Sequence, residues 1–425
     1  MMTKRHFLFL QGVASPFFAR LADHLAAQGH RVSRINFCTG DALYWGRRPA
    51  WNFANEVAEL ADYLQTLFAR HPFTDLVLFG SRRPVHLPAI ALAEEQGIRV
   101  HVFEEGYIRP NWLTLERGGV NADSSLPSNP DWYLAVAPHL PTDPVATAVD
   151  NRLRPRAAHD LVYHLANCLD PLLFAGYRTH RPHGATTEYL GWIRRFTQLA
   201  WQRRNDDREI RKLLAAESPY FLLPLQLNAD VQITRHSGYT GMPHLIDATL
   251  RSFAQHAPAQ SRLLIKNHPL DTGLVPYRRV IADLASELGI SERVVFLESG
   301  PLDALLPKAN GVITVNSTVG MTALELGCPT IALGRAIYDL PGLTFQGPLD
   351  AFWTQTPTPQ PQLFRAFRDV VMLTTQVNGN LYTSRGIRQA IANCDRLLAP
   401  ISPLQQMLSQ YPTDSRGLLV AESAT

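Results

Sequence analysis

Apolar residues in the first third of the chain follow two alternating patterns. Short runs in which nearly every position is apolar, such as residues 6–12 (HFLFLQG), predict strands covered on both faces, as in a parallel sheet. Residues 16–28 instead carry apolar side chains at helical spacing and stop before Gly29, which predicts a helix with a glycine after its end. With a second apolar run at 31–37, the order predicts a βαβ unit.

The same alternation fills two separate stretches. In the first, further strands are expected at 74–81, 99–106 and 131–136, with a helix at 88–97. In the second, strands are expected at 220–226, 261–269, 293–299, 311–317 and 329–334, and helices at 244–257, 277–289 and 318–327. We therefore predict an α/β fold of GT-B-like architecture, with two doubly wound Rossmann-like domains facing across a cleft. This architecture serves several enzyme classes, so it does not name a reaction.

The length of the chain and the alternation of strand and helix patterns predict how it divides into domains. A chain of 425 residues with 46% hydrophobic content exceeds what one core usually organises. The expected parts are an N-terminal Rossmann-like domain (1–137), a linker and helical segment (138–218), a C-terminal Rossmann-like domain (219–345) and a helical tail packing back on the N-terminal domain (346–425).

Charge and cysteine content exclude several classes of protein. The formal net charge of +3 does not give the strong positive field of a nucleic-acid-binding protein, so no nucleic-acid partner is expected. The four cysteines are far apart, which argues against a disulfide framework or a metal cluster and fits a reducing cytoplasm. The apolar start is too short to span a bilayer and no other segment is long enough, so no transmembrane helix is expected.

Candidate chemistry lies in the loops after the strands, where ligands bind in open α/β sheets. Glu104 and Glu105 end one apolar run, and adjacent carboxylates can divide the roles of base or nucleophile and hydrogen-bond partner. Arg109 could orient this pair or bind an anionic sugar acid. The alternative is a solvated turn, or a salt bridge between the glutamates and Arg109.

Residues 315–327 (VNSTVGMTALELG) predict an anion site. A strand ends, Ser317 and Thr318 follow, and a helix begins whose free N–H groups favour a phosphate. The alternative, given equal weight, is that one hydroxyl only caps the helix.

Three other loops supply weaker candidates. His268, followed by Pro269, comes after a strand in the same domain as the anion site, although a lone histidine is more often structural. Gln226 follows another strand there. Gln11 and Gly12 lie in a glycine loop after the first strand, without the spacing of a dinucleotide fingerprint.

Five ordered segments carry a resemblance to a known family: residues 7–45, 103–119, 222–233, 265–269 and 315–327. Together they resemble capsule polysaccharide biosynthesis and export proteins of the KpsS type, with LipB-like relatives, over about residues 6 to 345. The resemblance implies a β-Kdo glycosyltransferase that uses CMP-Kdo and a phosphatidylglycerol-type lipid acceptor to start the linker of group 2 capsules. It implies a cytoplasmic protein on the inner face of the inner membrane, working with a KpsC-type transferase and an ABC exporter.

The resemblance also implies residue roles. His268, Pro269, Ser317 and Thr318 would hold the CMP moiety, and Glu325 would accept ribose hydroxyls. The acidic motif, E-D-G in KpsC-like relatives, is here Glu104, Glu105 and Gly106, so either glutamate could be catalytic. The acceptor would meet Gln11, Gly12, Arg109 and Gln226. One phosphate held by a histidine and a helix N-terminus implies no metal or other cofactor.

The residues leave alternatives open. A sugar-nucleotide epimerase or hydrolase of the same architecture would turn over without an acceptor, and a non-catalytic export scaffold would not turn over at all. Residues 178–212 mix basic and aromatic side chains, which predicts a membrane contact; the alternative, weighted equally, is a helix packed on the domains.

Overall fold

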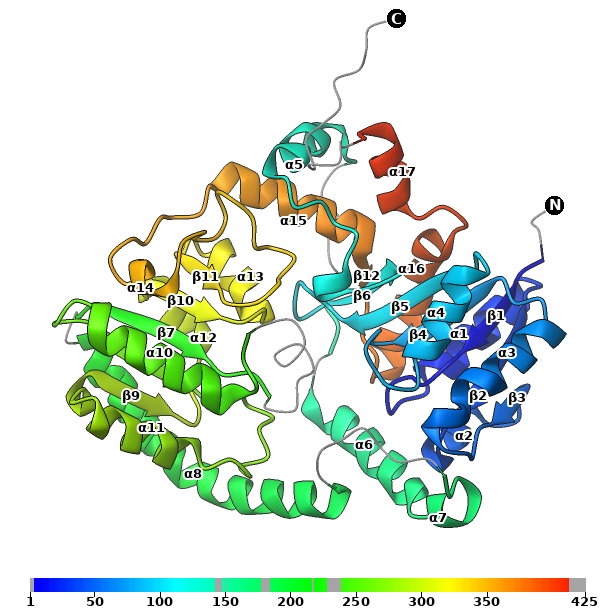
Figure 1. Ribbon diagram of the computed structural model, residues 1–425, viewed down its shortest axis with the longest axis horizontal. Helices are drawn as coiled ribbons and strands as arrows, with labels where there is room; N and C mark the ends of the chain where they lie inside the picture. Colours follow the sequence, from blue (N-terminus) through cyan, green and yellow to red (C-terminus); the bar gives the residue numbers. More distant parts are fainter. Residues whose placement is uncertain are drawn as a thin grey trace, which may run out of the picture.

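The computed structural model describes residues 4–141, 147–150, 152–176, 184–215, 218–227 and 238–412. These residues form two α/β units, each built on one sheet (Figure 1). The first sheet has seven strands in the order β12-β6-β5-β4-β1-β2-β3, and the second has five in the order β11-β10-β7-β8-β9. The predicted α/β fold with two Rossmann-like units, a GT-B-like architecture, is confirmed.

Most strands are parallel. The first sheet comprises β1 (His6–Phe9), β2 (Arg31–Asn36), β3 (Ala50–Asn52), β4 (Asp75–Phe79), β5 (Arg99–Glu105), β6 (Trp112–Arg117) and β12 (Gln376–Asn378). In it, β6 is antiparallel to both β5 and β12. The second comprises β7 (Tyr220–Pro224), β8 (Arg262–Lys266), β9 (Val294–Leu297), β10 (Gly311–Thr314) and β11 (Thr330–Ala332), all parallel.

Helices cover both faces of each sheet. The first unit carries α1 (Phe17–Ala27), α2 (Thr39–Trp45), α3 (Leu60–Arg70), α4 (Leu87–Glu95), α5 (Pro130–Val136) and α16 (Ser384–Leu398). The second carries α10 (Met242–His256), α11 (Tyr277–Glu287), α12 (Leu302–Leu305), α13 (Thr318–Glu325) and α14 (Leu349–Phe352). The remaining helices are α6 (Leu153–Asn167), α7 (Asp170–Leu173), α8 (Ala185–Ala215), α15 (Pro361–Thr375) and α17 (Pro403–Gln410).

The continuous apolar run of β1 shows why these segments are strands. Phe7 and Phe9 pack in the cluster under α1 and α16, while Leu8 and Leu10 pack in the cluster under α3 and α4. Successive side chains of a strand point to opposite faces, so a strand buried on both faces needs an apolar residue at every position.

One expected strand is wrong: residues 131–136 form helix α5. Asn129 caps this helix by accepting a hydrogen bond from the backbone N–H of Asp131, and Pro130 occupies its first turn. Trp132, Tyr133 and Val136 are buried, at a spacing that suits one helical face. The strand that follows β5 is instead the antiparallel β6.

The C-terminal tail, expected to be helical, also contains a strand. Its α14 packs on α10 of the second unit, then α15 contacts both α13 and α5, and β12 joins the first sheet beside β6. Finally α16 packs on α1. The tail therefore contributes to both units, and residues of α5, α13 and α15 share one buried cluster between them.

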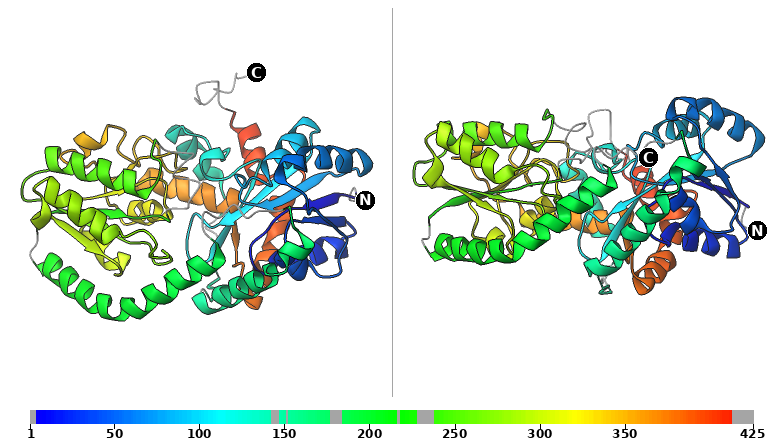
Figure 2. Two further views of the ribbon diagram at one scale, coloured as in Figure 1. Left: turned by 60° about the horizontal axis from the view of Figure 1, so that its bottom comes forward. Right: turned by 90° about the horizontal axis from the view of Figure 1, so that it is seen from below.

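Helices α6, α7 and α8 lie along one edge of both units (Figure 1, Figure 2). α6 packs on α2 of the first unit, whereas Ile210 and Leu213 of α8 belong to the core under the second sheet. Among the helices of the described ranges, none has the length and apolar content needed to cross a membrane.

Candidate active site

Glu105 is the last residue of β5 and is held by two side chains from distant segments. Its Oε1 accepts hydrogen bonds from Arg156 Nη1 (3.1 Å) and Tyr382 Oη (3.2 Å). The Arg156 guanidinium lies over the Tyr382 ring, 5.0 Å from its centroid. Burial alone would lower the pKa of Arg156, but its electrostatic interactions with Tyr382 and Glu105 raise it above its usual value. Arg156 is thus a permanent cation beside this carboxylate.

Glu104 lies in different surroundings, because neighbouring side chains on a strand point to opposite faces. Its Oε1 accepts from the backbone N–H of Glu105 (3.0 Å), and its Oε2 lies 3.4 Å from the position a Cβ would take at Gly80. Gly80 has a φ of 72° and follows β4. Each carboxylate is therefore held separately, so each can have its own chemical role.

The sequence allowed a salt bridge between Arg109 and Glu105. Among the described residues, the ion pair of Glu105 is with Arg156 instead. Arg109 is exposed, and its Nε donates to the backbone oxygen of Gly106 (3.4 Å). Its guanidinium is consequently available to an anionic ligand.

Side chains of the first unit hold the loop after β1 in place. Arg83 Nη1 donates to Gln11 Oε1 (3.1 Å) and to the backbone oxygen of Gly12 (2.9 Å). Gln11 Nε2 donates to Asp41 Oδ2 (3.4 Å). A Cβ at Gly12 would lie 2.7 Å from the Phe18 ring. Packing against Phe18 explains the glycine, and an acceptor-binding role for Gln11 and Gly12 stays a prediction.

His268 follows β8 in the second unit and is held as a neutral ring. Its Nδ1 accepts from the backbone N–H of Leu270 (3.1 Å), which assigns the hydrogen to Nε2. Burial, followed by the positive charges of Lys266, Arg109, Arg195 and Arg156, lowers the pKa of His268 to about 4. At neutral pH the side chain is therefore a hydrogen-bond donor through Nε2 rather than a cation. Its contact with the CMP phosphate stays a prediction.

Arg195 of α8 fixes the His268 loop, a role that the sequence did not reveal. Its guanidinium donates to the backbone oxygens of Asp271 (2.5 Å), His268 (3.0 Å) and Pro269 (3.4 Å). Arg195 is only 8% exposed, so it is not part of a membrane contact. Pro269 is exposed at the tip of this loop.

The sequence left two interpretations of the start of α13 open: an anion site, or a hydroxyl that only caps the helix. Ser317 caps the helix, since its Oγ accepts from the backbone N–H of Val319 (3.2 Å). Thr318 lines a pocket at the helix start. Ser317 thus caps the helix, and the roles of Ser317 and Thr318 in binding CMP stay predictions.

Asn316 adds a buried donor to the same place. Its Nδ2 is buried with no hydrogen-bond partner among the residues of the described ranges. Gln226 orients this amide: Gln226 Nε2 donates to Asn316 Oδ1 (3.1 Å) and the backbone N–H of Asn316 donates to Gln226 Oε1 (3.3 Å). A buried amide N–H without a partner is costly, and a ligand oxygen would satisfy it.

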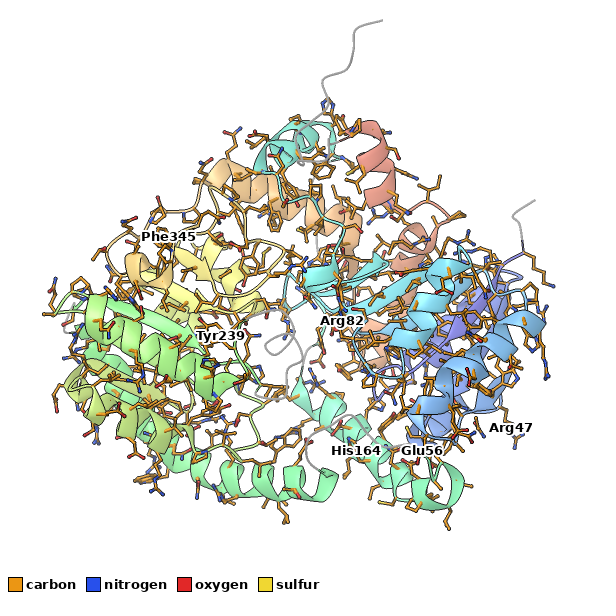
Figure 3. The ribbon with its side chains drawn as sticks, in the orientation of Figure 1. Arg47, Glu56, Arg82, His164, Tyr239 and Phe345 are labelled. Atoms are coloured by element: carbon orange, nitrogen blue, oxygen red, sulfur yellow. The ribbon has the colours of Figure 1, made fainter. Side chains whose placement is uncertain are left out.

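The pocket at the start of α13 lies between the two units. Tyr107 and Asn121 line it from the first unit, and Asn316, Thr318 and Arg335 line it from the second. Figure 3 shows Arg82 and Tyr239 on the edges of the two units that face each other. The charges of Arg109 and Arg156 also reach His268 across this junction. The two sets of loops therefore form one site.

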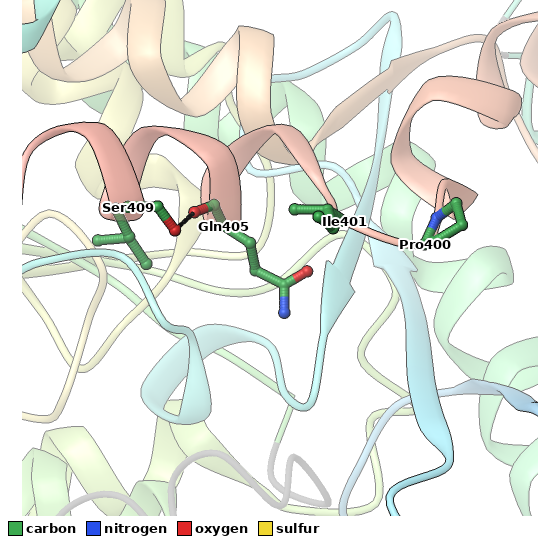
Figure 4. A pocket seen from close by; sticks show the side chains of 5 residues that line it. Pro400, Ile401, Gln405 and Ser409 are labelled. Atoms are coloured by element: carbon green, nitrogen blue, oxygen red, sulfur yellow. Dashed lines mark hydrogen bonds between the residues drawn. The ribbon is translucent and has the colours of Figure 1, made fainter.

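Two features lie outside this site. Glu325 is the last residue of α13 and is exposed, about 12 Å along the helix from Ser317, so its ribose-binding role stays a prediction without a supporting contact. A separate hollow at α17 is lined by Pro400, Ile401, Gln405, Leu408 and Ser409 (Figure 4). It contains no ionisable side chain and thus no group for acid–base chemistry.

No group of three or more histidine, cysteine, aspartate or glutamate side chains within the described ranges is arranged to hold a metal ion. The polar groups at the junction are instead one buried amide, one hydroxyl, one neutral imidazole, several arginines and two carboxylates. Such a set can bind an anion in the second unit and present a carboxylate from the first.

Comparison with known proteins places this site in a family. The model of the family described as capsule polysaccharide biosynthesis protein matches residues 74–382. The chain belongs to this family. Within the capsule polysaccharide biosynthesis family, the chain is 34% identical to the capsule polysaccharide export protein KpsS of Escherichia coli, over 90% of this chain and 98% of that protein. It is also 34% identical to the capsule polysaccharide modification protein LipB of Neisseria meningitidis serogroup B, over 88% of this chain and 91% of that protein.

Among solved structures, the chain is similar to KpsC of Thermosulfurimonas dismutans, a β-Kdo 2,7 transferase, with 16% identity and a TM-score of 0.44. The match covers 92% of this chain and 98% of that one. The matched family region, residues 74–382, includes every predicted site residue except Gln11 and Gly12, and it ends at Tyr382. Arg156, Arg195 and Tyr382, which local sequence patterns did not identify, also lie within this matched region.

Proposed function

We propose that this chain is a retaining glycosyltransferase that transfers Kdo from CMP-Kdo to a (lyso)phosphatidylglycerol-type lipid. The product would begin the poly-Kdo linker of a group 2 capsular polysaccharide. The observation that carries the proposal is the buried Asn316 Nδ2, which has no hydrogen-bond partner among the described residues and lies next to Thr318 in the chain, at the start of α13. Glu105 is held on the facing unit.

In this proposal the second unit binds the donor. The phosphate of CMP accepts from Asn316 Nδ2 and from Thr318 Oγ1 at the start of α13, where the helix dipole favours an anion. His268 donates through Nε2, and the exposed guanidinium of Arg335 supplies positive charge at the pocket. These groups would hold a single phosphate without a divalent metal.

Glu105 is the proposed nucleophile. Its carboxylate forms a bond to C2 of Kdo while the bond from C2 to the CMP phosphate oxygen breaks, and the electron pair leaves with CMP. The acceptor hydroxyl then displaces Glu105, and its proton passes to Glu104. Two inversions give overall retention. Arg156 and Tyr382 position Glu105 for both steps.

The remaining partners follow from the acceptor. A phosphatidylglycerol-type acceptor lies in a bilayer, so the protein would act as a peripheral protein at the inner face of the inner membrane. A KpsC-type transferase would extend the first Kdo residue, within an assembly that includes an ABC exporter. Arg109, Gln11, Gly12 and Gln226 are the proposed acceptor contacts; in the structure, Gln226 also orients Asn316.

The test is to incubate purified protein with CMP-Kdo and lyso-phosphatidylglycerol and to weigh the lipid by mass spectrometry. The expected product is heavier by one Kdo residue, and its yield is unchanged by EDTA. Free Kdo in place of a lipid adduct would identify a hydrolase, and an isomerised donor would identify an epimerase. Unchanged CMP-Kdo under all conditions would support a non-catalytic scaffold.

A further inference from the structure

Helix α6 has its polar face turned toward the protein. Tyr163 Oη donates to Asp41 Oδ1 (3.0 Å), and Asn167 Oδ1 accepts from the backbone N–H of Gly40 (2.7 Å). One turn earlier, His159 Nδ1 lies 2.8 Å from Tyr44 Oη. His159, Tyr163 and Asn167 are four residues apart and thus share one face. Hydrogen bonds, rather than an apolar stripe, attach α6 to α2.

The opposite side of α6 and the following α7 are apolar and exposed. We name this surface the leucine face; it comprises Leu153, Leu161, Val162, Leu165, Leu169, Leu172 and Leu173, each between 45% and 81% exposed. Seven of the thirteen large apolar side chains exposed in the described ranges belong to it. Single exposed leucines are ordinary, but this concentration forms a patch of the kind that marks an interaction site.

The outer side of α8 adds apolar and cationic groups on the same edge of the molecule (Figure 1). Leu190, Ile193 and Trp201 are exposed there. So are the cations Arg194, Arg203, Arg204, Arg208, Arg211 and Lys212; the acids beside them are the exposed Asp207 and the part-exposed Glu209, which pairs with Lys212 at 2.8 Å. The inner side of α8 carries Arg195 and Asp206, which are bonded to loops of the second unit.

We infer that the leucine face and the outer side of α8 form a docking surface for an anionic phospholipid bilayer. Apolar side chains that enter the boundary between headgroups and acyl chains, together with arginines that pair with anionic headgroups, are the chemistry of interfacial helices. The cationic excess on α8 favours an anionic lipid surface over a neutral apolar partner. The inference deepens the proposed function, whose acceptor is a lipid, but its binding test needs no transfer activity.

The docking surface is connected to the site through one helix. Arg156 lies on α6 between Leu153 and Leu161, and it binds Glu105 at 3.1 Å. A bilayer that contacts the leucine face would therefore lie next to the helix that positions the candidate nucleophile. This arrangement places a lipid acceptor near the carboxylate without a segment that crosses the membrane.

The experiment measures flotation of the full chain with vesicles of phosphatidylglycerol and phosphatidylcholine. The test variant is Leu165→Ser with Leu172→Ser, and the matched control is Leu326→Ser with Ile401→Ser. All four side chains are at least 46% exposed, but the control pair lies on other surfaces. The test variant should bind about tenfold or more weakly, because each leucine loses its transfer into the bilayer, while the control matches wild type. Binding should also fall as salt rises and on pure phosphatidylcholine.

Thermal unfolding should be the same for all three proteins, because exposed leucines contribute little to the folded core. Equal vesicle binding by the test variant and wild type would overturn the inference. So would light scattering that shows a dimer of wild type that the test variant dissolves, because the leucine face would then be covered by a second copy. If wild type binds vesicles as expected but transfers no Kdo to lipid or to a water-soluble acceptor, that result would count against the proposed function alone.

Discussion

Glu105 at the end of β5 and Arg156 on α6 form an ion pair with an N–O distance of 3.1 Å, although 51 residues separate them in the chain. Tyr382, 277 residues away from Glu105, donates to the same carboxylate oxygen. Helix α6 and the bend before α16, which both lie outside the N-terminal series of strands and helices, therefore complete the site of the first unit. A carboxylate held from two sides has little rotational freedom, which is what a nucleophile that must approach one carbon atom requires.

We predict that Tyr382→Phe and Arg156→Ala lower transfer without preventing donor binding. Tyr382→Phe removes one hydrogen bond and should lower kcat about tenfold, since one such bond contributes about 1 kcal/mol. Arg156→Ala removes the cation as well and should cost about a hundredfold. CMP affinity by calorimetry should stay within about twofold of wild type in Tyr382→Phe. A raised KM with normal kcat would show that these residues bind substrate rather than position Glu105.

His268 should contribute to CMP binding as a neutral donor. His268→Ala should weaken CMP binding about tenfold in calorimetry at pH 7, while thermal unfolding stays close to wild type. His268→Gln retains an N–H donor and should recover part of the affinity. CMP affinity that does not change in either variant would remove His268 from the donor site.

Removing the Arg195 side chain should reduce stability and CMP binding more than removing that of its exposed neighbour Arg194. Arg195→Ala leaves the backbone oxygens of Asp271 and His268 without their donor, and should destabilise the fold by roughly 2–4 kcal/mol. It should also weaken CMP binding, because the His268 loop is no longer held. Arg194→Ala, on the exposed side of α8, is the control and should leave both properties unchanged. Equal effects of the two changes would contradict the structural role of Arg195.

Lowering the pH should destabilise the protein over a pH range that is set by its buried histidines. Burial is the main cause that lowers the pKa values of His6, His101 and His268 to about 4, against 6.5 when unfolded. Between pH 6.5 and 4 the unfolded chain binds more protons, so the stability these neutral rings give at pH 7 is lost as pH falls through this window.

Urea unfolding at pH 7 and pH 4.5 measures this effect. His268→Gln should shrink the difference between the two pH values by roughly 1–2 kcal/mol, because one of the three proton-linked groups is gone. His139→Gln, at an exposed position, serves as the control and should leave the difference as in wild type. A His268→Gln protein as acid-sensitive as wild type would show that this ring titrates equally in both states.

The sequence predicted the parts of the fold that rest on apolar patterning. The sequence predicted β1, β2, β4 and β5 of the first sheet and all five strands of the second, because strands covered on both faces are apolar at nearly every position, as in β1 and β10. It did not predict β3, β6 or β12. The rule that ligands lie at the carboxyl ends of strands then led to Glu105, His268 and Thr318. Residues 131–136 were assigned wrongly because a short apolar run also fits a helix when only one face is buried.

The remaining site residues could not be read from local patterns. Arg156 and Tyr382 reach Glu105 only through the packing of α6 on α2 and of α16 on α1. Arg195 was grouped with the other arginines of α8, because a helix sequence does not reveal which cation faces a neighbouring loop. The leucine face was overlooked for the same reason, since a helix bound by polar contacts has its apolar side outward.

The central claim is that Glu105 transfers Kdo to a lipid, and CMP release from CMP-Kdo tests it most directly. Release should be measured for wild type, Glu105→Gln and Glu104→Gln, each with and without lyso-phosphatidylglycerol. Wild type should turn over CMP-Kdo only when the lipid is present, releasing no more than one CMP per enzyme without it, and Glu105→Gln, which still binds CMP as wild type does, should release none. Glu104→Gln should retain slow release, since it alters the base rather than the nucleophile. Release by wild type that is equally fast without the lipid, or near-normal transfer by Glu105→Gln, would contradict the account.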